Sequence, residues 1–402
     1  MRILFANDGF GDAGGVQSYL DAVIAGLVAR GHDLAILHRD ARPAPFARDA
    51  TRSLAQFRVA DLGVGGAVAA VRGWRPDVCF SHNMNLLDVD HGLAGVAPLV
   101  KFMHGYFGTC VSGQKRFGFP IARPCGRRFG PACAALYFPR RCGQLDLAKF
   151  ASQYRWAGRQ RALFAEYRAL VVASAHMKRE YVRNGAQAAR VHVNPLFPTE
   201  ELVPPLDPPA PASAPIVAFA ARMTGLKGGD VLIRAVADAS ARLSSPIRLT
   251  MMGDGPQRAA WERLARKRQV DCTFTGWQSG EARWRWLGGA TVLAVPSTWP
   301  EPFGLVGLEA AALGVPAVAF DVGGVREWLR PGENGYLVAG DPPRASAFAA
   351  VLVHAFTHPE ELAKMRRSAV EVARTMSLAR HLDRLEAIFA GDARAHAHSA
   401  GR

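Results

Sequence analysis

Short apolar runs alternate with helix-like segments along almost the whole chain, and this alternation limits the fold more than any other feature. The first run, residues 2–8 (RILFAND), precedes a glycine-rich loop and then residues 16–32. In that segment five apolar residues recur at helical spacing before a Gly-His stop: Leu20, Val23, Ile24, Leu27 and Val28. Further short runs resemble strands buried on both faces of a parallel sheet, at residues 33–38, 77–82, 98–104 and 169–175. The pattern predicts an α/β fold.

The alternation starts again in the second half, with an apolar run at 216–222, a loop at 223–229 and a helical pattern at 230–243. Between the halves lies a proline-rich segment, PTEELVPPLDPPAPASAP, which can form neither a helix nor a central strand. At 402 residues the chain is also too long for one ordinary core. We therefore predict two doubly wound, Rossmann-like domains facing across a cleft that holds the active site. The predicted boundaries are 1–200 for the first domain, 201–215 for the linker, 216–375 for the second domain, 376–391 for a last amphipathic helix and 392–402 for a disordered tail.

The sequence carries no sign of a membrane span. No apolar run reaches the roughly 18 residues that a span needs, and the N-terminus reads as a strand followed by a glycine loop rather than as a signal peptide. We expect a cytoplasmic protein.

The positive charge is concentrated in one segment. The formal net charge is +15, and between Lys101 and Arg183 there are 16 Lys or Arg residues against only Asp146, Glu166 and Glu180, a surplus of 13. A solvated face, an anionic membrane surface and an acidic acceptor all remain open as explanations. Nucleic acid is disfavoured because the sequence has no zinc-finger, RNP or helix-turn-helix pattern.

Two acidic residues, Glu301 and Glu309, lie eight residues apart around a Phe-Gly-Leu sequence. A helix beginning near Gly304 would place Glu309 inside the helix and Glu301 in the loop before it. Both carboxylates could then face one small ligand.

The second half, from about residue 216 to 338, resembles the donor-binding domain of glycosyltransferase family 4, whose members are retaining enzymes with the GT-B fold. The matching segments are AARMTGLKGGDVLIRA, MMGDGP, FTGW, PSTWPEPFGLVGLEAAALGVPAVAFDVGG and NGYLV, in the family's order and spacing. The first half matches more loosely, through GGVQSYLDAVIAGLVARGHDL and FMHGYFG. The resemblance implies a GT-B fold with the C-terminal helix crossing back to the N-terminal domain.

The resemblance also implies roles for charged residues. Arg222 and Lys227 lie in a glycine-rich loop before a helix, where cations and free N–H groups would hold the diphosphate of a nucleotide-sugar. In the family pattern Glu301 faces the sugar and Glu309 accepts hydrogen bonds from the ribose hydroxyls. His104, after an apolar run in the first half, resembles the histidine that contacts the donor sugar.

Smaller and apolar residues complete the implied donor site. Gly14 and Gly15 follow the first strand, where a missing side chain allows close approach of a ligand. Trp277 follows the segment expected to pass the nucleobase, although its indole could equally belong to the core. The remaining donor-binding residues implied by the match are Gly253, Phe303, Gly304 and Leu305.

The reaction implied is a retaining transfer of a sugar from a nucleotide-diphosphate sugar, with a family bias toward UDP, to a hydroxyl of a glycan, lipid-linked or small-molecule acceptor. No catalytic nucleophile is placed, so attack from the same face as the leaving phosphate is expected. No divalent metal is required, because the cations and the helix start supply positive charge. The alternatives are a GT-B epimerase or phosphorylase and a non-catalytic protein that binds surfaces through its basic segment. If the acceptor is lipid-linked or anionic, electrostatic contact with the inner face of the membrane is expected through Arg127, Arg128, Arg140 and Arg141.

Four cysteines cluster in a basic insertion expected at about 105–160: Cys110, Cys125, Cys133 and Cys142. The 14, 7 and 8 residues between them differ from the close Cys-x-x-Cys pairs of structural zinc sites, and disulfides are unusual in a cytoplasmic chain. A structural zinc or other thiolate-bound metal, reduced cysteines that pack in a core, and disulfides all remain open.

Overall fold

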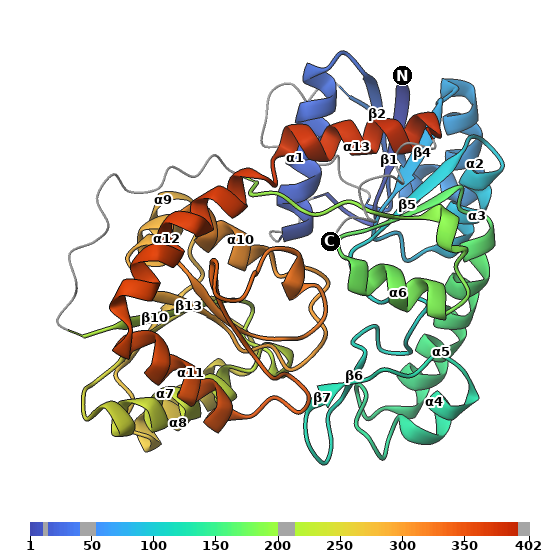
Figure 1. Cartoon of the computed structure of the whole chain (residues 1–402). Helices are drawn as coiled ribbons and strands as arrows, with labels where there is room; N and C mark the ends of the chain where they lie inside the picture. Colours follow the sequence, from blue (N-terminus) through green and yellow to red (C-terminus); the bar gives the residue numbers. More distant parts are fainter. Residues whose placement is uncertain (11–14, 41–53, 200–213, 393–402) are drawn as a thin grey trace.

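The computed structural model describes residues 1–10, 15–40, 54–199 and 214–392, which form one α/β domain in each half of the chain (Figure 1). The predicted fold of two doubly wound domains is confirmed. Gly14, most of the proline-rich linker and nearly all of the tail lie outside the described residues.

The N-terminal domain is built on a seven-stranded sheet with the order β3-β2-β1-β4-β5-β8-β9, in which every pairing is parallel. The strand order reverses direction between β1 and β4, so the loops after these strands open toward a crevice at the carboxyl edge. The strands are β1 (Arg2–Ala6), β2 (Asp33–His38), β3 (Ala55–Arg58), β4 (Val78–Ser81), β5 (Leu99–Met103), β8 (Ala169–Val172) and β9 (Val191–Val193). The main connecting helices are α1 (Gly15–Ala29), α2 (Val59–Trp74), α3 (Leu87–Ala94), α5 (Leu147–Ala162) and α6 (Ala175–Arg183).

The C-terminal domain repeats this plan with a parallel six-stranded sheet in the order β12-β11-β10-β13-β14-β15. Here the order reverses between β10 and β13. The strands are β10 (Ile216–Ala220), β11 (Arg248–Met252), β12 (Cys272–Gly276), β13 (Val292–Val295), β14 (Ala317–Phe320) and β15 (Gly335–Val338). The helices are α7 (Gly229–Leu243), α8 (Arg258–Lys267), α9 (Gly280–Gly288), α10 (Leu305–Ala312), α11 (Ala345–Thr357) and α12 (Pro359–Arg374).

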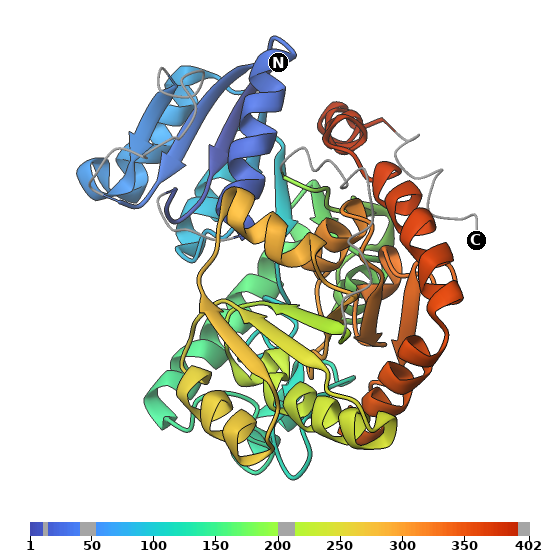
Figure 2. The same cartoon turned by 90° about the vertical axis from the view of Figure 1, so that its left-hand side faces the viewer.

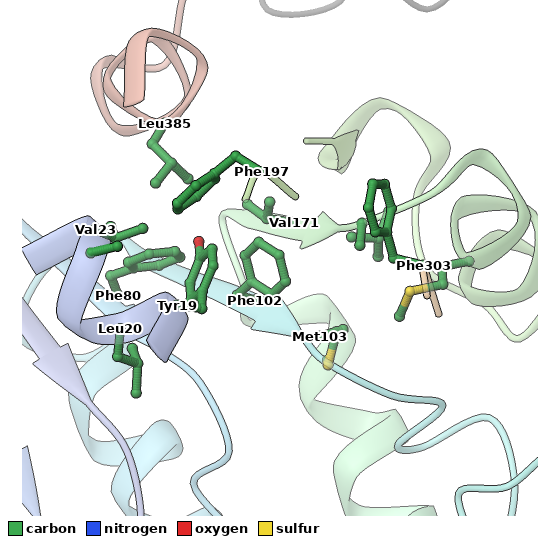
Figure 3. Packing of buried hydrophobic residues seen from close by; sticks show 14 of the residues in the cluster. Tyr19, Leu20, Val23, Phe80, Phe102, Met103, Val171, Phe197, Phe303 and Leu385 are labelled. Atoms are coloured by element: carbon green, nitrogen blue, oxygen red, sulfur yellow. The ribbon is translucent and has the colours of Figure 1, made fainter. Parts of the chain in front are cut away.

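The last helix, α13 (Leu378–Ala390), returns to the N-terminal domain and packs beside α1, as expected (Figure 1). Figure 2, turned by 90°, shows α12 and α13 following one another along one side of the molecule. The contact between α1 and α13 has an apolar interior and ion pairs at its edge. Leu385 packs near Phe197 and Tyr19 (Figure 3), while Arg30 of α1 forms ion pairs with Asp383 and Glu386 at 2.7 and 2.6 Å.

The basic insertion between β5 and β8 forms a small subdomain with its own core. It contains a two-stranded hairpin, β6 (Arg116–Phe117) and β7 (Arg123–Pro124), and the short helix α4 (Pro131–Leu136), and it leads into α5. Its core consists of Val111, Phe129, Tyr137 and Ala157, against which Cys133 and Cys142 pack. Figure 1 shows this subdomain at one end of the N-terminal domain, with β6 and β7 beside the C-terminal domain.

Within the described part of the chain, none of the helices combines the length and the hydrophobicity that crossing a bilayer demands.

Candidate active site

Two adjoining cavities lie where the carboxyl ends of β1 and β10 face each other across the domain interface. Their volumes are about 400 and 480 Å³. Six residues line both cavities, and they lie at the start of α1, at the end of β10 or just after it, and at the start of α10. They are Gly15, Ala220, Ala221, Arg222, Leu305 and Val306. The position agrees with the rule that ligands of α/β sheets bind at the point where the strand order reverses.

The first cavity contains a lysine–glutamate ion pair. Lys227 follows β10 in a short 3₁₀ turn, Gly225–Lys227, and its Nζ lies 2.7 Å from Oε1 of Glu301. The same oxygen accepts hydrogen bonds from the Ser297 hydroxyl and, at 3.0 Å, from Nε1 of Trp299. The side chain of Glu301 is only 4% exposed and that of Lys227 is 26% exposed. The arrangement fixes the ammonium group at the edge of the cavity.

Close backbone approach explains the glycine after Lys227. Gly228 has a φ of +68°, and a Cβ placed there would lie 1.9 Å from the carbonyl oxygen of Pro296. Any larger residue would push the Lys227 turn away from the strand end that leads to Glu301. The glycine therefore helps to hold the ion pair together.

The start of α10 forms another wall of the first cavity. Gly304 immediately precedes the helix with a φ of +88°, and Phe303 and Leu305 flank it in the cavity lining. Phe303 is buried, and its carbonyl accepts a hydrogen bond from Nε1 of Trp328 at 2.7 Å. The free N–H groups of the first helical turn thus lie at the cavity wall, where they can donate to an anion or to hydroxyl groups.

The second cavity contains Glu309, whose two oxygens are both engaged by the guanidinium of Arg283, at 2.5 and 3.2 Å. Arg283 lies on α9, and the sequence analysis did not identify it. An arginine in the sequence EARW gave no signal, because the spacing of α9 from α10 along the chain does not show that their side chains meet. Glu309 therefore does not face the cavity as an unpaired acid.

Trp277 and Gly253 also line the second cavity. The indole of Trp277 is 60% exposed, so it does not belong to the core. Gly253 has a φ of +119°, and a Cβ there would lie 2.1 Å from the carbonyl oxygen of Ala221. This close approach brings the ends of β10 and β11 together beneath the cavity.

His104 reaches the first cavity from the N-terminal domain. Its Nε2 lies 3.0 Å from Nδ1 of His82, and its ring stacks on Phe102 with 4.5 Å between centroids. Burial, followed by the charges of Lys101 and His381, lowers the pKa of His104 from 6.5 to about 3. The imidazole is therefore neutral at physiological pH, and it can exchange a hydrogen bond with a ligand without contributing charge.

Gly15, the first residue of α1, lines both cavities. Gly14 lies outside the described residues. All the other residues predicted to bind the donor line at least one cavity.

Tyr106 is a second residue that the sequence analysis missed. It is fully buried, its hydroxyl donates to the backbone carbonyl of Glu301 at 3.4 Å, and its ring meets that of Trp299 edge-on. Tyr106 thus connects the N-terminal domain to the residue that pairs with Lys227. Only its position two residues after His104 in the matched segment could have suggested a role.

The four clustered cysteines lie in the insertion, away from both cavities, and all four have free thiols. Across the described ranges, no group of three or more His, Cys, Asp or Glu side chains is placed to hold a metal ion. Burial, followed by the other three cysteines, raises the pKa of Cys142 to about 12, so the four thiols lie near enough to interact electrostatically. Cys133 and Cys142 also pack against the core of the insertion, and the structural metal stays a prediction.

Comparison with known proteins identifies the class of the fold. HepE from Anabaena, solved in complex with UDP, superimposes with a TM-score of 0.69 at 17% identity, covering 97% of this chain and 100% of that one. WaaG, a glycosyltransferase involved in lipopolysaccharide biosynthesis, gives a TM-score of 0.65 at 18% identity, with coverages of 97% and 100%. The chain therefore has the GT-B fold.

The sequence comparisons match the second half of the chain to a family of glycosyltransferases. Residues 207–372 match the family model described as glycosyl transferases group 1. A D-inositol 3-phosphate glycosyltransferase from Rhodococcus erythropolis is 36% identical over 171 residues, and one from Nocardioides sp. is 38% identical over 151 residues. These segments are 40% and 33% of this chain and only 38% and 32% of the relatives' length. Residues 207–372 therefore resemble the glycosyl transferases group 1 family, and this match confirms the resemblance seen in the sequence.

Proposed function

We propose that the protein is a retaining glycosyltransferase that moves a sugar from a nucleotide-diphosphate sugar to an acceptor hydroxyl. The observation that carries this proposal is the cavity between the domains, in which Arg222, the Lys227–Glu301 ion pair and the start of α10 surround a neutral His104. Such a cavity can stabilise the negative charge that develops on a departing diphosphate. The UDP bound to HepE supports UDP as the nucleotide.

The diphosphate is assigned to Arg222 and Lys227. The ammonium of Lys227 has three N–H donors, one of which points to Glu301, so the others are available to phosphate oxygens. Among the described residues, the three donors to the Glu301 carboxylate all reach Oε1, which leaves Oε2 to accept from a sugar hydroxyl. Glu301 then serves both to orient Lys227 and to contact the donor sugar.

Transfer with retention follows from attack on the face that the leaving group occupies. The bond between the anomeric carbon and the phosphate oxygen breaks, and a bond between that carbon and the acceptor oxygen forms. The acceptor proton passes to an oxygen of the departing diphosphate. His104 can hydrogen-bond the sugar as a neutral imidazole, and the protein mainly positions the reactants and stabilises charge.

The nucleoside is assigned to the second cavity, beside Trp277 and the Arg283–Glu309 pair. For Glu309 to accept from the ribose hydroxyls, as the family resemblance implies, its carboxylate must share its lone pairs between Arg283 and the ribose. A carboxylate has about four acceptor positions, so both interactions can coexist.

Screening nucleotide-sugars tests the function directly. A bound donor raises the unfolding temperature by mass action, and we expect UDP-sugars to do so more than UMP. A stabilising donor should then be converted to a glycoside with the same anomeric configuration as the donor. Epimerised nucleotide-sugar, or release of sugar phosphate, would instead indicate an epimerase or a phosphorylase. If the protein binds the donor but transfers sugar to none of a broad panel of acceptors, it is a non-catalytic binding protein.

The acceptor is proposed to lie at an anionic membrane surface on the cytoplasmic side, or to be a soluble glycan or small molecule. The hairpin of the insertion supports the membrane, because Phe119 and Ile121 at its tip are 48% and 56% exposed. The N–H of Phe119 donates to the carbonyl of Arg140 at 3.1 Å, and the guanidinium of Arg141 lies 5.0 Å from the Phe119 ring centroid. Apolar tips and cations therefore share one surface, which adds an apolar component to the electrostatic contact predicted from the charge alone.

Vesicle binding tests the membrane proposal. Binding should require anionic lipid and weaken as salt shortens the Debye length from about 10 Å at 0.1 M to about 3 Å at 1 M. Replacing Phe119 and Ile121 by serine should weaken vesicle binding at both salt concentrations. Replacing Arg127, Arg128, Arg140 and Arg141 by glutamine should reduce vesicle binding, most strongly at low salt. Donor binding should remain unchanged in both variants. Equal binding to neutral vesicles, or none to anionic ones, favours a soluble acceptor.

A further inference from the structure

The hairpin of the insertion contacts the C-terminal domain at the turn that carries Lys227. We propose that Arg116 is a positioning residue, which holds the Gly225–Lys227 turn from the N-terminal domain and thereby sets the place of the Lys227 ammonium. The inference rests on the proposed function for its catalytic consequence, although the contact itself is a feature of the fold.

Arg116 approaches a carbonyl that a second side chain also fixes. Its Nη2 lies 3.5 Å from the carbonyl oxygen of Gly225, and the hydroxyl of Thr298 donates to the same oxygen at 3.1 Å. The backbone N–H of Thr298 also donates to the carbonyl of Leu226 at 2.8 Å. The turn is therefore held from one side by its own domain and from the other by the insertion.

The sequence of the turn explains why outside contacts matter. Three glycines, Gly225, Gly228 and Gly229, surround Lys227, and glycine gives the backbone more freedom than any other residue. A segment of this kind depends on neighbouring groups to keep one conformation. Lys227 belongs to this turn, and its Nζ lies 2.7 Å from Glu301. A shift of the turn would therefore move the ammonium away from the place proposed for the diphosphate.

Arg116 is itself rigidly supported. The preceding residue, Lys115, is 1% exposed, and its Nζ lies 2.7 Å from Glu180 of α6. The carbonyl of Lys115 accepts from the N–H of Cys125 at 2.7 Å, which ties the two sides of the hairpin together. A buried ion pair of this kind depends on its partners staying in place, since separating them leaves an unpaired buried charge.

The surroundings of Arg116 raise the free-energy cost of placing a guanidinium there. Among the described residues, its Nε is buried without a hydrogen-bond partner, and burial lowers the pKa of the guanidinium while Asp230 opposes this shift. A shorter or neutral side chain would avoid the buried N–H. The guanidinium next to the turn of Lys227 instead adds positive potential where the diphosphate is expected.

The test compares Arg116→Gln and Arg116→Lys with a control, Arg155→Gln, which removes an exposed arginine from the neighbouring helix α5. Hydrogen exchange of the amides in residues 224–230 is measured on the full chain without ligand. We expect faster exchange in Arg116→Gln, an intermediate rate in Arg116→Lys and no change in the control.

Steady-state kinetics with a nucleotide-sugar donor supply the second measurement. In Arg116→Gln we expect kcat to fall about tenfold while the donor KM changes less than about threefold, because a misplaced catalytic cation slows the chemical step more than it weakens binding. Arg116→Lys should recover part of kcat. Unchanged exchange, or faster exchange with normal kcat, overturns the proposal. If the wild type transfers no sugar at all, the proposed function fails separately, and the exchange rates alone decide whether Arg116 holds the turn.

Discussion

Acid should destabilise this protein through the histidines buried around Tyr19. Burial lowers the pKa of His104 and of His381 to about 3 in the folded state, against an ordinary value of 6.5. The pKa of His82 is lowered well below 6.5 by burial, by His104 and by Lys101. These imidazoles stay neutral in the folded protein and take up protons when it unfolds.

The sign and size of the effect follow from linkage. Because the folded pKa lies below the unfolded one, the unfolded state binds more protons between pH 6.5 and 3, so stability is complete above pH 6.5 and falls as the pH falls below it. At pH 5, 1.5 units below 6.5, each imidazole removes about 2 kcal/mol. His104 and His381 together remove about 4 kcal/mol, a large part of the roughly 5–15 kcal/mol typical of a folded domain.

The assay is urea unfolding between pH 7.5 and 5, with variants that separate titration from hydrogen bonding. His381→Gln should be less stable than the wild type at pH 7.5, but its stability should fall less steeply below pH 6.5, by about 1.4 kcal/mol per pH unit. Tyr19→Phe removes the 2.9 Å hydrogen bond to His381 and keeps the imidazole, so it should lose stability without a change of slope. Parallel curves for the wild type and His381→Gln would refute the reasoning.

Further predictions concern the two cavities and metals. Glu309→Ala should weaken donor binding, since it also leaves Arg283 without its partner, whereas Glu301→Ala should mainly slow transfer; unchanged donor affinity in Glu309→Ala would remove its ribose role. Lys227→Ala and Arg222→Ala should each reduce the rate at least about 100-fold, because one charge-stabilising donor is worth roughly 3 kcal/mol; near-normal turnover in either would place the diphosphate elsewhere. Activity should persist in chelator, because both cavity glutamates are already paired with cations, and loss of activity restored by a divalent ion would contradict this. The structural zinc is tested by metal analysis of the purified protein, where one equivalent supports it and metal-free protein with six titratable thiols removes it.

The fold could be predicted from the sequence because both domains repeat one local pattern. Buried parallel strands such as Leu99–Met103 appear as unbroken apolar runs, and α1 follows β1 after a glycine-rich loop in the way that doubly wound sheets require. The proline-rich segment indicated the boundary between the domains, because proline is excluded from helix interiors and central strands. The matched segments also indicated Lys227, Glu301 and Glu309 as site residues, and each of the three lines one of the two cavities.

Contacts between distant segments could not be predicted in the same way. Arg283 meets Glu309 from a neighbouring helix 26 residues away, and Tyr106 meets the carbonyl of Glu301 from the other domain. Neither contact has a periodicity or a spacing that a single sequence reveals. The insertion presents the same difficulty, because the sequence did not show that two of its four cysteines pack against an aromatic core.

These long-range contacts change the interpretation of the acid pair from which the functional hypothesis began. Glu301 and Glu309 do not face the cavities as two unpaired carboxylates, since Lys227 and Arg283 are bound to them. Each cavity therefore contains a pair of opposite charges whose geometry is set before a ligand enters, and preorganised charges need little rearrangement when negative charge develops on a leaving group. The N-terminal domain supports the first of these pairs from two sides, through Tyr106 at the backbone of Glu301 and Arg116 at the turn of Lys227. Docking of the N-terminal domain, which we propose to receive the acceptor, is in this way linked to the position of the groups that we propose to hold the donor.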